Sequence, residues 1–161
     1  MIELFRYQSD DGREPFTEWL ESLRDKVAQA RVRIRLRQVE AGNLGGLAAE
    51  TGMKKLTGVV SHHERELAEL RADHELAVEY LKAAMESLDD PANRSAGLLA
   101  LRTVAEAYGG LGAVAAEAGI SRESLYRTLS AKGNPTLKTL LAVLKAVGMR
   151  LSVEPESEVR V

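Results

Sequence analysis

Apolar residues recur at helical spacing along most of the chain, which predicts a mainly α-helical protein. In the C-terminal half, Gly and Pro positions separate predicted helices at about 91–108, 111–118, 122–130 and 137–147. After them, residues 149–153 alternate between apolar and polar side chains, which is typical of a short strand. We therefore expect a helical domain that ends in a short C-terminal strand.

The N-terminal region predicts a β-α-α fragment. Residues 2–8 have strand character, and two helices are expected at about 15–23 and 26–41. The apolar face of the first helix would consist of Phe16, Trp19, Leu20 and Leu23. In the second helix the expected buried side consists of Val32, Leu36 and Val39, and the rest of the surface carries Arg31, Arg33, Arg35 and Arg37 as a solvated or ion-paired face. Because a lone strand cannot satisfy its backbone groups, either part of the fold has been cut off or the partner strand comes from elsewhere.

Residues 61–88 predict a long acidic helix with an apolar seam at heptad spacing. The seam consists of Leu67, Leu70, His74, Ala77, Leu81, Ala84 and Leu88. It favours packing against a partner helix or the following domain, with a coiled-coil dimer as the alternative. Asp73 is also suited to cap a separate helix, which would divide the segment in two.

Residues 111–129, LGAVAAEAGISRESLYRTL, have the spacing of a helix-turn-helix motif. Ala115 is small enough for the second helix to cross closely over it, and Gly119 supplies the positive φ that the tight turn requires. Ile120 and Leu125 would fill the angle between the helices. An ordinary corner between two core helices is the alternative interpretation.

The second helix of this motif would present polar side chains to a DNA groove. Ser121 is a good N-cap residue for it. The side chains expected to face outward from its first turns are Arg122, Glu123, Ser124 and Arg127. Tyr126 is expected either to stack on a sugar or to fill the domain core.

The formal net charge of −2 conceals an uneven distribution. Residues 47–91 carry five basic and ten acidic side chains, whereas residues 92–161 carry nine basic and six acidic ones. Within 119–150 six basic side chains are opposed only by Glu123, a local balance of +5. Attraction to phosphate depends on the local field, so the predicted motif is electrostatically suited to DNA.

The text EYLKAAMESLDD, followed by VAAEAGISRESLYRTLSAKGNPTLKTLLAVLKAVGMRLSVEP, resembles the HigA-like addiction-module antitoxins, which have a lambda-repressor-like (Xre) fold. The resemblance covers about residues 73–155. It implies an antitoxin that forms a homodimer, binds double-stranded operator DNA and represses its own operon. The family often has a polar residue, commonly Gln, where this chain has Gly112 and Ala113.

The resemblance also implies positions for the DNA-contacting residues. Arg122, Glu123, Ser124 and Arg127 would face bases or phosphates, and Ser121, Lys132, Asn134 and Thr136 would lie near the DNA backbone. Tyr126 and Lys138 complete the predicted DNA-binding set.

Residues 1–46, with the core text PFTEWLESLRD, resemble the N-terminal part of the RelE/HigB-like toxins. The central sheet of that family should follow Gly46, but the chain continues through ETGMKKLTG into the antitoxin-like part. We therefore interpret the chain as a toxin remnant joined in frame to an antitoxin, whose original start would be Met53. A RelE/HigB-like toxin is the implied partner.

These interpretations divide the chain into five parts. They are a toxin-like β-α-α remnant at 1–46, a linker at 47–60, an acidic helical segment at 61–90, a helix-turn-helix domain at 91–155 and a tail at 156–161.

No residue pattern predicts catalysis, a metal site or a cofactor. The chain has no Cys, and His62, His63, Glu66 and His74 lack the spacing of a closed metal site. Residues 1–46 offer no general base, acid and phosphate clamp for RNA cleavage. With neither a secretory signal nor an apolar run of membrane-spanning length, a soluble cytoplasmic protein is expected.

Three hypotheses about function follow. The first is a dimeric DNA-binding repressor that reads a palindromic operator through residues 122–130. The second is a protein-interaction module in which the acidic segment neutralises a basic toxin while DNA binding is vestigial. The third, RNA cleavage by residues 1–46 with borrowed strands, conflicts with the missing catalytic groups. The dimer interface would use either the strand at 149–153 or the helix at 61–88.

Overall fold

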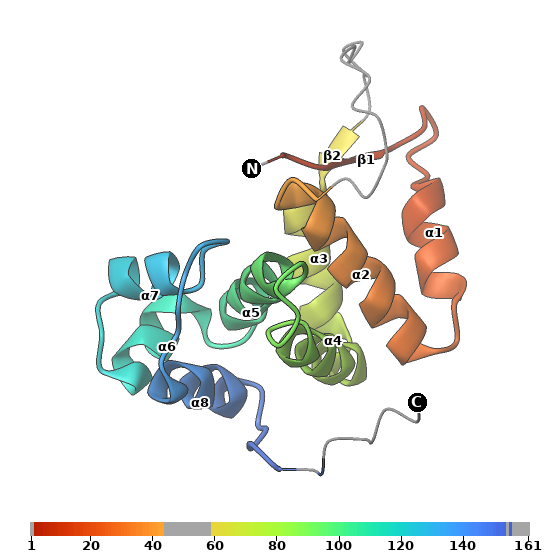
Figure 1. The fold of residues 1–161 in the computed structure, drawn as a ribbon. Coiled ribbons are helices and arrows are strands. Elements are labelled where there is room, and N and C mark those ends of the chain that lie inside the picture. Colours follow the sequence, from red (N-terminus) through yellow and green to blue (C-terminus); the bar gives the residue numbers. More distant parts are fainter. Residues whose placement is uncertain (1, 44–58, 154, 156–161) are drawn as a thin grey trace.

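The computed structural model describes residues 2–43, 59–153 and 155, so that Met53, most of the predicted linker and the tail lie outside the described residues (Figure 1). The prediction of a mainly α-helical fold is confirmed. The elements of the described part are β1 (Phe5–Tyr7), α1 (Pro15–Ser22), α2 (Lys26–Glu40), β2 (Val59–Ser61), α3 (His62–Ala72), α4 (His74–Glu86), α5 (Arg94–Ala107), α6 (Gly110–Ala118), α7 (Arg122–Thr128) and α8 (Leu137–Ala146). No described helix has both the length and the apolar character needed to cross a membrane.

The central element is α5, in which every residue from 96 to 105 is buried. A helix with apolar residues around its whole circumference belongs inside a core. Helices α2, α3 and α4 pack on one side of α5, and α6 and α8 pack on the other (Figure 1). One core cluster runs from Ala30 and Ile34 in α2 through Leu101 in α5 to Leu125 and Val143. Helix α2 and the predicted DNA-binding motif therefore share one continuous core.

The partner of the N-terminal strand is β2, which leads directly into α3. The two strands pair antiparallel, with Phe5 opposite Ser61 and Tyr7 opposite Val59. In β1 the usual placement of side chains is reversed, because Arg6 is 3% exposed while Phe5 and Tyr7 are 44% and 51% exposed. The side chain of β1 that points into the protein is therefore the charged Arg6.

The acidic segment consists of two helices, as the alternative interpretation of Asp73 predicted. The Asp73 carboxylate accepts a hydrogen bond from the Leu76 amide at 2.9 Å and caps α4. The same carboxylate pairs with Lys26 of α2 at 2.6 Å. The seam positions that are fully buried within this chain are Leu70, Ala77, Leu81 and Ala84.

The prediction for the buried side of α2 was wrong. Arg33 and Arg37 are 0% and 3% exposed, whereas Arg31 and Arg35 lie in solvent. The positions expected to be buried, Val32, Leu36 and Val39, are only half-buried. Burial of two arginines is tolerable here because α3 presents carboxylates to them, a partnership that helical periodicity alone does not reveal.

One further expectation was wrong. Residues 149–153 form no strand, because strand pairing requires a partner and the described strands pair only with each other. Trp19 is 49% exposed, while Leu20 beside it is fully buried. Helix α1 has only eight residues and buries a narrower face than its apolar pattern suggested.

Gly97→Ala should lower the free energy of unfolding by about 1–3 kcal/mol through overpacking. A Cβ at Gly97 would lie 2.7 Å from the carbonyl oxygen of Ala84, where α4 crosses α5. Gly112→Ala is the control, since a Cβ there meets nothing within 4 Å; it should stabilise α6 by about 0.5–1 kcal/mol. Chemical denaturation measures both, and equal effects would contradict the close helix crossing.

Candidate nucleic-acid interface

The turn between α6 and α7 is a Schellman motif built on Gly119. Its φ is +70°, and the amides of Gly119 and Ile120 donate to the carbonyl oxygens of Ala116 and Ala115, each at 3.0 Å. A Cβ at Gly119 would lie 2.7 Å from Nζ of Lys138. Backbone conformation and the neighbouring lysine therefore both favour glycine at this turn.

Helix α7 is held against the core by one face. Leu125 is fully buried and Ala115 below it is 2% exposed, while Ile120 is half-buried against the same core. Ser121 caps the helix, because its hydroxyl accepts the Ser124 amide at 3.1 Å. These contacts give the helix-turn-helix arrangement that the sequence predicted and leave the other face of α7 outward.

The ten residues predicted to bind DNA lie on α7, on the loop that follows it and at the start of α8. Ser124 is half-buried, and the side chains that lie in solvent are Ser121, Arg122, Glu123, Tyr126, Arg127, Lys132, Asn134, Thr136 and Lys138. Within the described part of the chain, neither Arg122 nor Arg127 forms an ion pair; Arg127 reaches only the Ser124 hydroxyl, at 3.5 Å. Both guanidinium groups are therefore presented to solvent.

Some of these residues also have structural roles. Asn134 accepts a hydrogen bond from Arg94 at 3.0 Å, and Thr136 caps α8 by accepting the Thr139 amide at 3.3 Å. The ring of Tyr126 is 47% exposed, with the guanidinium carbon of Arg102 4.6 Å from its centroid. Tyr126 is therefore packed against Arg102 while remaining partly exposed to solvent.

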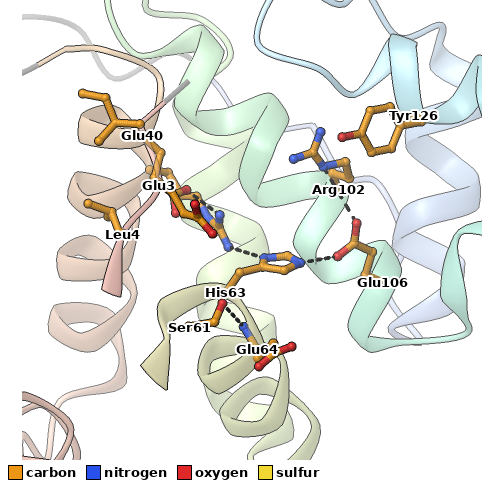
Figure 2. A pocket seen from close by; sticks show the side chains of 11 residues that line it. Glu3, Leu4, Glu40, Ser61, His63, Glu64, Arg102, Glu106 and Tyr126 are labelled. Atoms are coloured by element: carbon orange, nitrogen blue, oxygen red, sulfur yellow. Dashed lines mark hydrogen bonds and ion pairs between the residues drawn. The ribbon is translucent and has the colours of Figure 1, made fainter. Parts of the chain in front are cut away.

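A cleft of about 500 Å³ lies beside Tyr126, between α5, α3, α2 and residues 2–4 ahead of β1 (Figure 2). Its polar lining includes Arg102, Glu106 and His63. His63 approaches Glu106 at 2.6 Å and Arg37 at 3.4 Å, which joins α3 to both α5 and α2. Sequence reasoning did not single out Arg102 or Glu106, because neither stands out from the buried helix that carries them.

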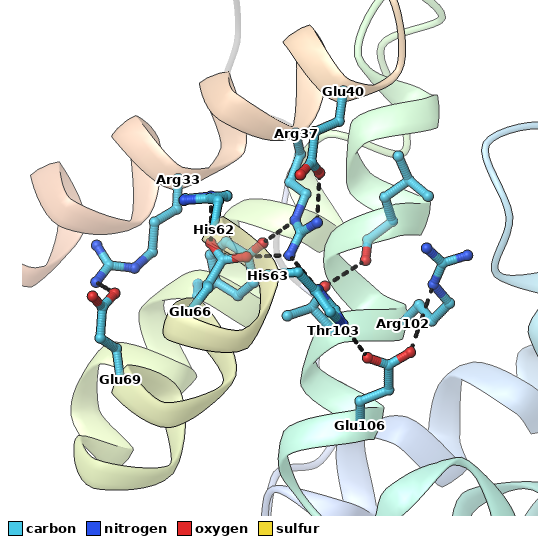
Figure 3. A network of polar contacts seen from close by, with 12 residues as sticks. Arg33, Arg37, Glu40, His62, His63, Glu66, Glu69, Arg102, Thr103 and Glu106 are labelled. Atoms are coloured by element: carbon cyan, nitrogen blue, oxygen red, sulfur yellow. Dashed lines mark hydrogen bonds and ion pairs between the residues drawn. The ribbon is translucent and has the colours of Figure 1, made fainter. Parts of the chain in front are cut away.

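The lining of this cleft continues into a buried polar network centred on Arg37 (Figure 3). Arg37 pairs with Glu66 of α3 and with Glu40 on its own helix, and its Nε donates to the Tyr80 hydroxyl at 3.1 Å. Burial alone would raise the pKa of Glu66, but the charge of Arg37 and the neighbouring cations hold it below its ordinary value. The carboxylate is therefore kept ionised although it is completely buried.

His62 lies in the same interior and is neutral at pH 7. Its Nδ1 accepts a hydrogen bond from Arg6 at 2.9 Å, and burial lowers its pKa to about 4. Its Nε2 lies 4.0 Å from Glu66. Among the described residues, no group of three or more His, Cys, Asp or Glu side chains is arranged to hold a metal ion. His62 and His63 instead form hydrogen bonds with the arginines and glutamates around them.

The fold and this outward basic helix define a helix-turn-helix protein. Residues 62–155 match the family described as "probable addiction module antidote protein", and the chain belongs to that family. An uncharacterized protein of Haemophilus influenzae (strain ATCC 51907 / DSM 11121 / KW20 / Rd) is 35% identical over 83 residues, which is 52% of this chain and 84% of that protein. No solved structure matches.

Membership in this family identifies an antitoxin and implies a toxin partner. It favours a regulatory role over a catalytic one. The family match begins at His62, the first residue of α3. Consequently β1, α1, α2 and β2 all lie outside the matched part, although α2 packs directly on α4 and α5 within it.

Acidification should destabilise the protein through His62. Its pKa is about 4 when folded and about 6.5 in an unfolded chain, so the unfolded state takes up the proton first. This contribution to stability is fully present above about pH 6.5 and is lost as the pH falls towards 4, at up to about 1.4 kcal/mol per pH unit. Urea denaturation at pH 7.5 and 5.5 measures it.

His62→Gln is the control variant, because Gln still accepts a hydrogen bond but does not titrate. Between pH 7.5 and 5.5 the wild-type protein should lose about 1 kcal/mol more than the variant. Equal losses would contradict a neutral, buried His62.

Proposed function

We propose that this antitoxin is a transcriptional repressor of a toxin–antitoxin operon, which binds double-stranded operator DNA as a homodimer through α7. The observation that carries the proposal is the outward face of α7, where Arg122 and Arg127 form no ion pair within the described residues. This face lies in the segment 119–150, whose local charge is +5. A positive, exposed and rigidly packed helix fits the major groove of DNA.

In this proposal the candidate DNA-binding residues divide into two groups. Arg122 and Arg127 bond guanine edges or phosphates, and Glu123 and Ser124 face neighbouring base edges. The residues that position the protein on the DNA backbone are Ser121, Tyr126, Lys132, Asn134, Thr136 and Lys138. Because Ser121 and Thr136 cap α7 and α8, phosphate contacts at these residues would be fixed directly to helix ends.

A palindromic operator requires two copies of α7 about one DNA turn, roughly 34 Å, apart. Helix α8 exposes Leu137 and Leu141, which are 60% and 43% exposed, and Leu151 beyond it is 46% exposed. These apolar side chains support a contact between copies at α8 and the segment that follows it. The seam of α3 and α4 is less suited, because its central residues are buried within the chain.

The lambda-repressor-like (Xre) and HigA-like assignment belongs to this proposal, with the helix-turn-helix domain at 91–155. We also propose that residues 1–46 are a RelE/HigB-like toxin remnant. The order β1, α1, α2 supports this interpretation, as does the recruitment of β2, a strand from just before the antidote part, in place of a toxin sheet.

Arg127→Ala should weaken binding to the DNA upstream of the gene by about 1–3 kcal/mol if Arg127 contacts a base, since the variant loses a charge-assisted pair. Fluorescence anisotropy with a labelled duplex measures the change. Arg31→Ala is the matched control, because it removes one exposed arginine from α2 and should leave affinity unchanged. Unchanged binding by Arg127→Ala would remove Arg127 from the interface.

The affinity of the wild-type protein for the same duplex should fall steeply as salt rises, because each neutralised phosphate releases counterions. A slope near zero in a plot of log affinity against log salt concentration would contradict phosphate contacts.

A further inference from the structure

Three arginines from residues 2–43 reach across to the part of the chain that matches the antidote family. Arg6 of β1 forms a two-pronged pair with Glu69 of α3, and Arg33 of α2 pairs with the same carboxylate. Arg37, one turn beyond Arg33, pairs with Glu66. In each of these pairs the cation comes from outside the matched part and the carboxylate from inside it.

These contacts are deeply buried. The side chains of Arg6, Arg33 and Arg37 are 1–3% exposed, and those of Glu66 and Glu69 are 0% and 8% exposed. A buried carboxylate without a cation carries a desolvation penalty of several kcal/mol. Glu66 and Glu69 of α3 are therefore stable in the buried state only when a basic segment covers them.

Apolar contacts follow the same helix face of α2. Ala30 and Ile34, which alternate with the two arginines along this face, enter the core cluster that contains Leu70, Ala77 and Leu81 of α3 and α4. The surface on α3 and α4 thus fits a helix with two arginines four residues apart and small or branched apolar residues beside them on the same face. The same surface also accepts an arginine from a neighbouring strand, as Arg6 of β1 pairs with Glu69.

We propose that this surface, formed by Glu66 and Glu69 of α3 with Tyr80 of α4, is the toxin-docking face of the antidote unit, and that residues 2–43 occupy it in cis. The proposal rests on the antidote role and assigns it a surface. The partner that fits is a chain with a basic strand-and-helix segment like that of residues 2–43. In the intact protein the tethered segment competes with any such partner.

The docking face is separate from the helix proposed to read DNA. Helix α5 lies between α2 and α7 (Figure 1). An occupied docking face therefore leaves the outward side of α7 accessible, and the two activities are measurable independently on one sample.

The test uses the full chain with a protease site placed within residues 47–52 and then cleaved. The probe is a fluorescent peptide of residues 1–46, and fluorescence anisotropy with size exclusion follows its entry into the cleaved protein. The peptide should exchange into the cleaved protein and fail to enter the uncut one, because the tether holds the competing segment at a high effective concentration.

Two charge-reversed peptides test whether the buried arginines are what the surface recognises. The peptide with Arg33→Glu and Arg37→Glu should bind at least 100-fold more weakly than the wild-type peptide, because both reversals face buried carboxylates. The peptide with Arg31→Glu and Arg35→Glu has the same charge and should bind like the wild-type peptide, since these positions face solvent. Equal binding of both reversed peptides would overturn the proposal.

Two more outcomes are decisive. If the cleaved protein aggregates or the peptide never exchanges, residues 2–43 are an integral part of the core and the docking proposal fails. A gel shift of the same cleaved sample with the upstream DNA tests the repressor function separately. Loss of DNA binding with intact peptide exchange would reject only that function.

Discussion

The structure depends on the mutual neutralisation of buried charges between two segments that are distant in sequence. Arg37 and Glu66 are both almost completely removed from water, and either group alone would carry a large desolvation penalty. Burial opposes the charge of Arg37, but the carboxylates and the Tyr80 hydroxyl around it hold its pKa well above the ordinary value. Since neither segment can bury its charges without the other, the position of α2 on α3 and α4 is strongly specified.

A polar interior of this kind restricts the arrangements that its segments can adopt. An apolar core accepts many similar arrangements, whereas a guanidinium group must meet its carboxylate with the correct geometry. The inward arginine of β1 shows the result, because this strand places Arg6 in the interior and leaves Phe5 and Tyr7 half-exposed. The strand is held by its charge and by its pairing with β2 rather than by an apolar face.

Helix α5 connects this interior to the proposed DNA-reading helix. Arg102 contacts the ring of Tyr126 and lies 3.9 Å from Glu106, which in turn meets His63. The same helix therefore supports the outward face of α7 on one side and the charge network on the other. The proposed DNA-reading surface and the proposed docking face therefore lie around one helix.

Local features of the protein could be predicted from short stretches of sequence because their causes are local. Gly119 at the turn, Ser121 as a cap and Leu125 as an apolar anchor act within a few residues of one another. Asp73 likewise identified a helix start. The exposed side of α7 followed from the same periodicity, so the candidate DNA-binding residues were accessible to sequence reasoning.

The sequence by itself determined most of the helices, the cap at Ser121 and the outward basic face, because backbone hydrogen bonds and helical periodicity are set by near neighbours. Only the tertiary structure decided which face of α2 is buried, since Arg33 and Arg37 enter the interior when Glu69 and Glu66 lie opposite them. It also decided that β1 pairs with β2 and that residues 149–153 form no strand. These outcomes depend on partners that are distant in sequence. A charged side chain cannot be buried, and an extended segment cannot satisfy its backbone hydrogen bonds, until the partner lies beside it.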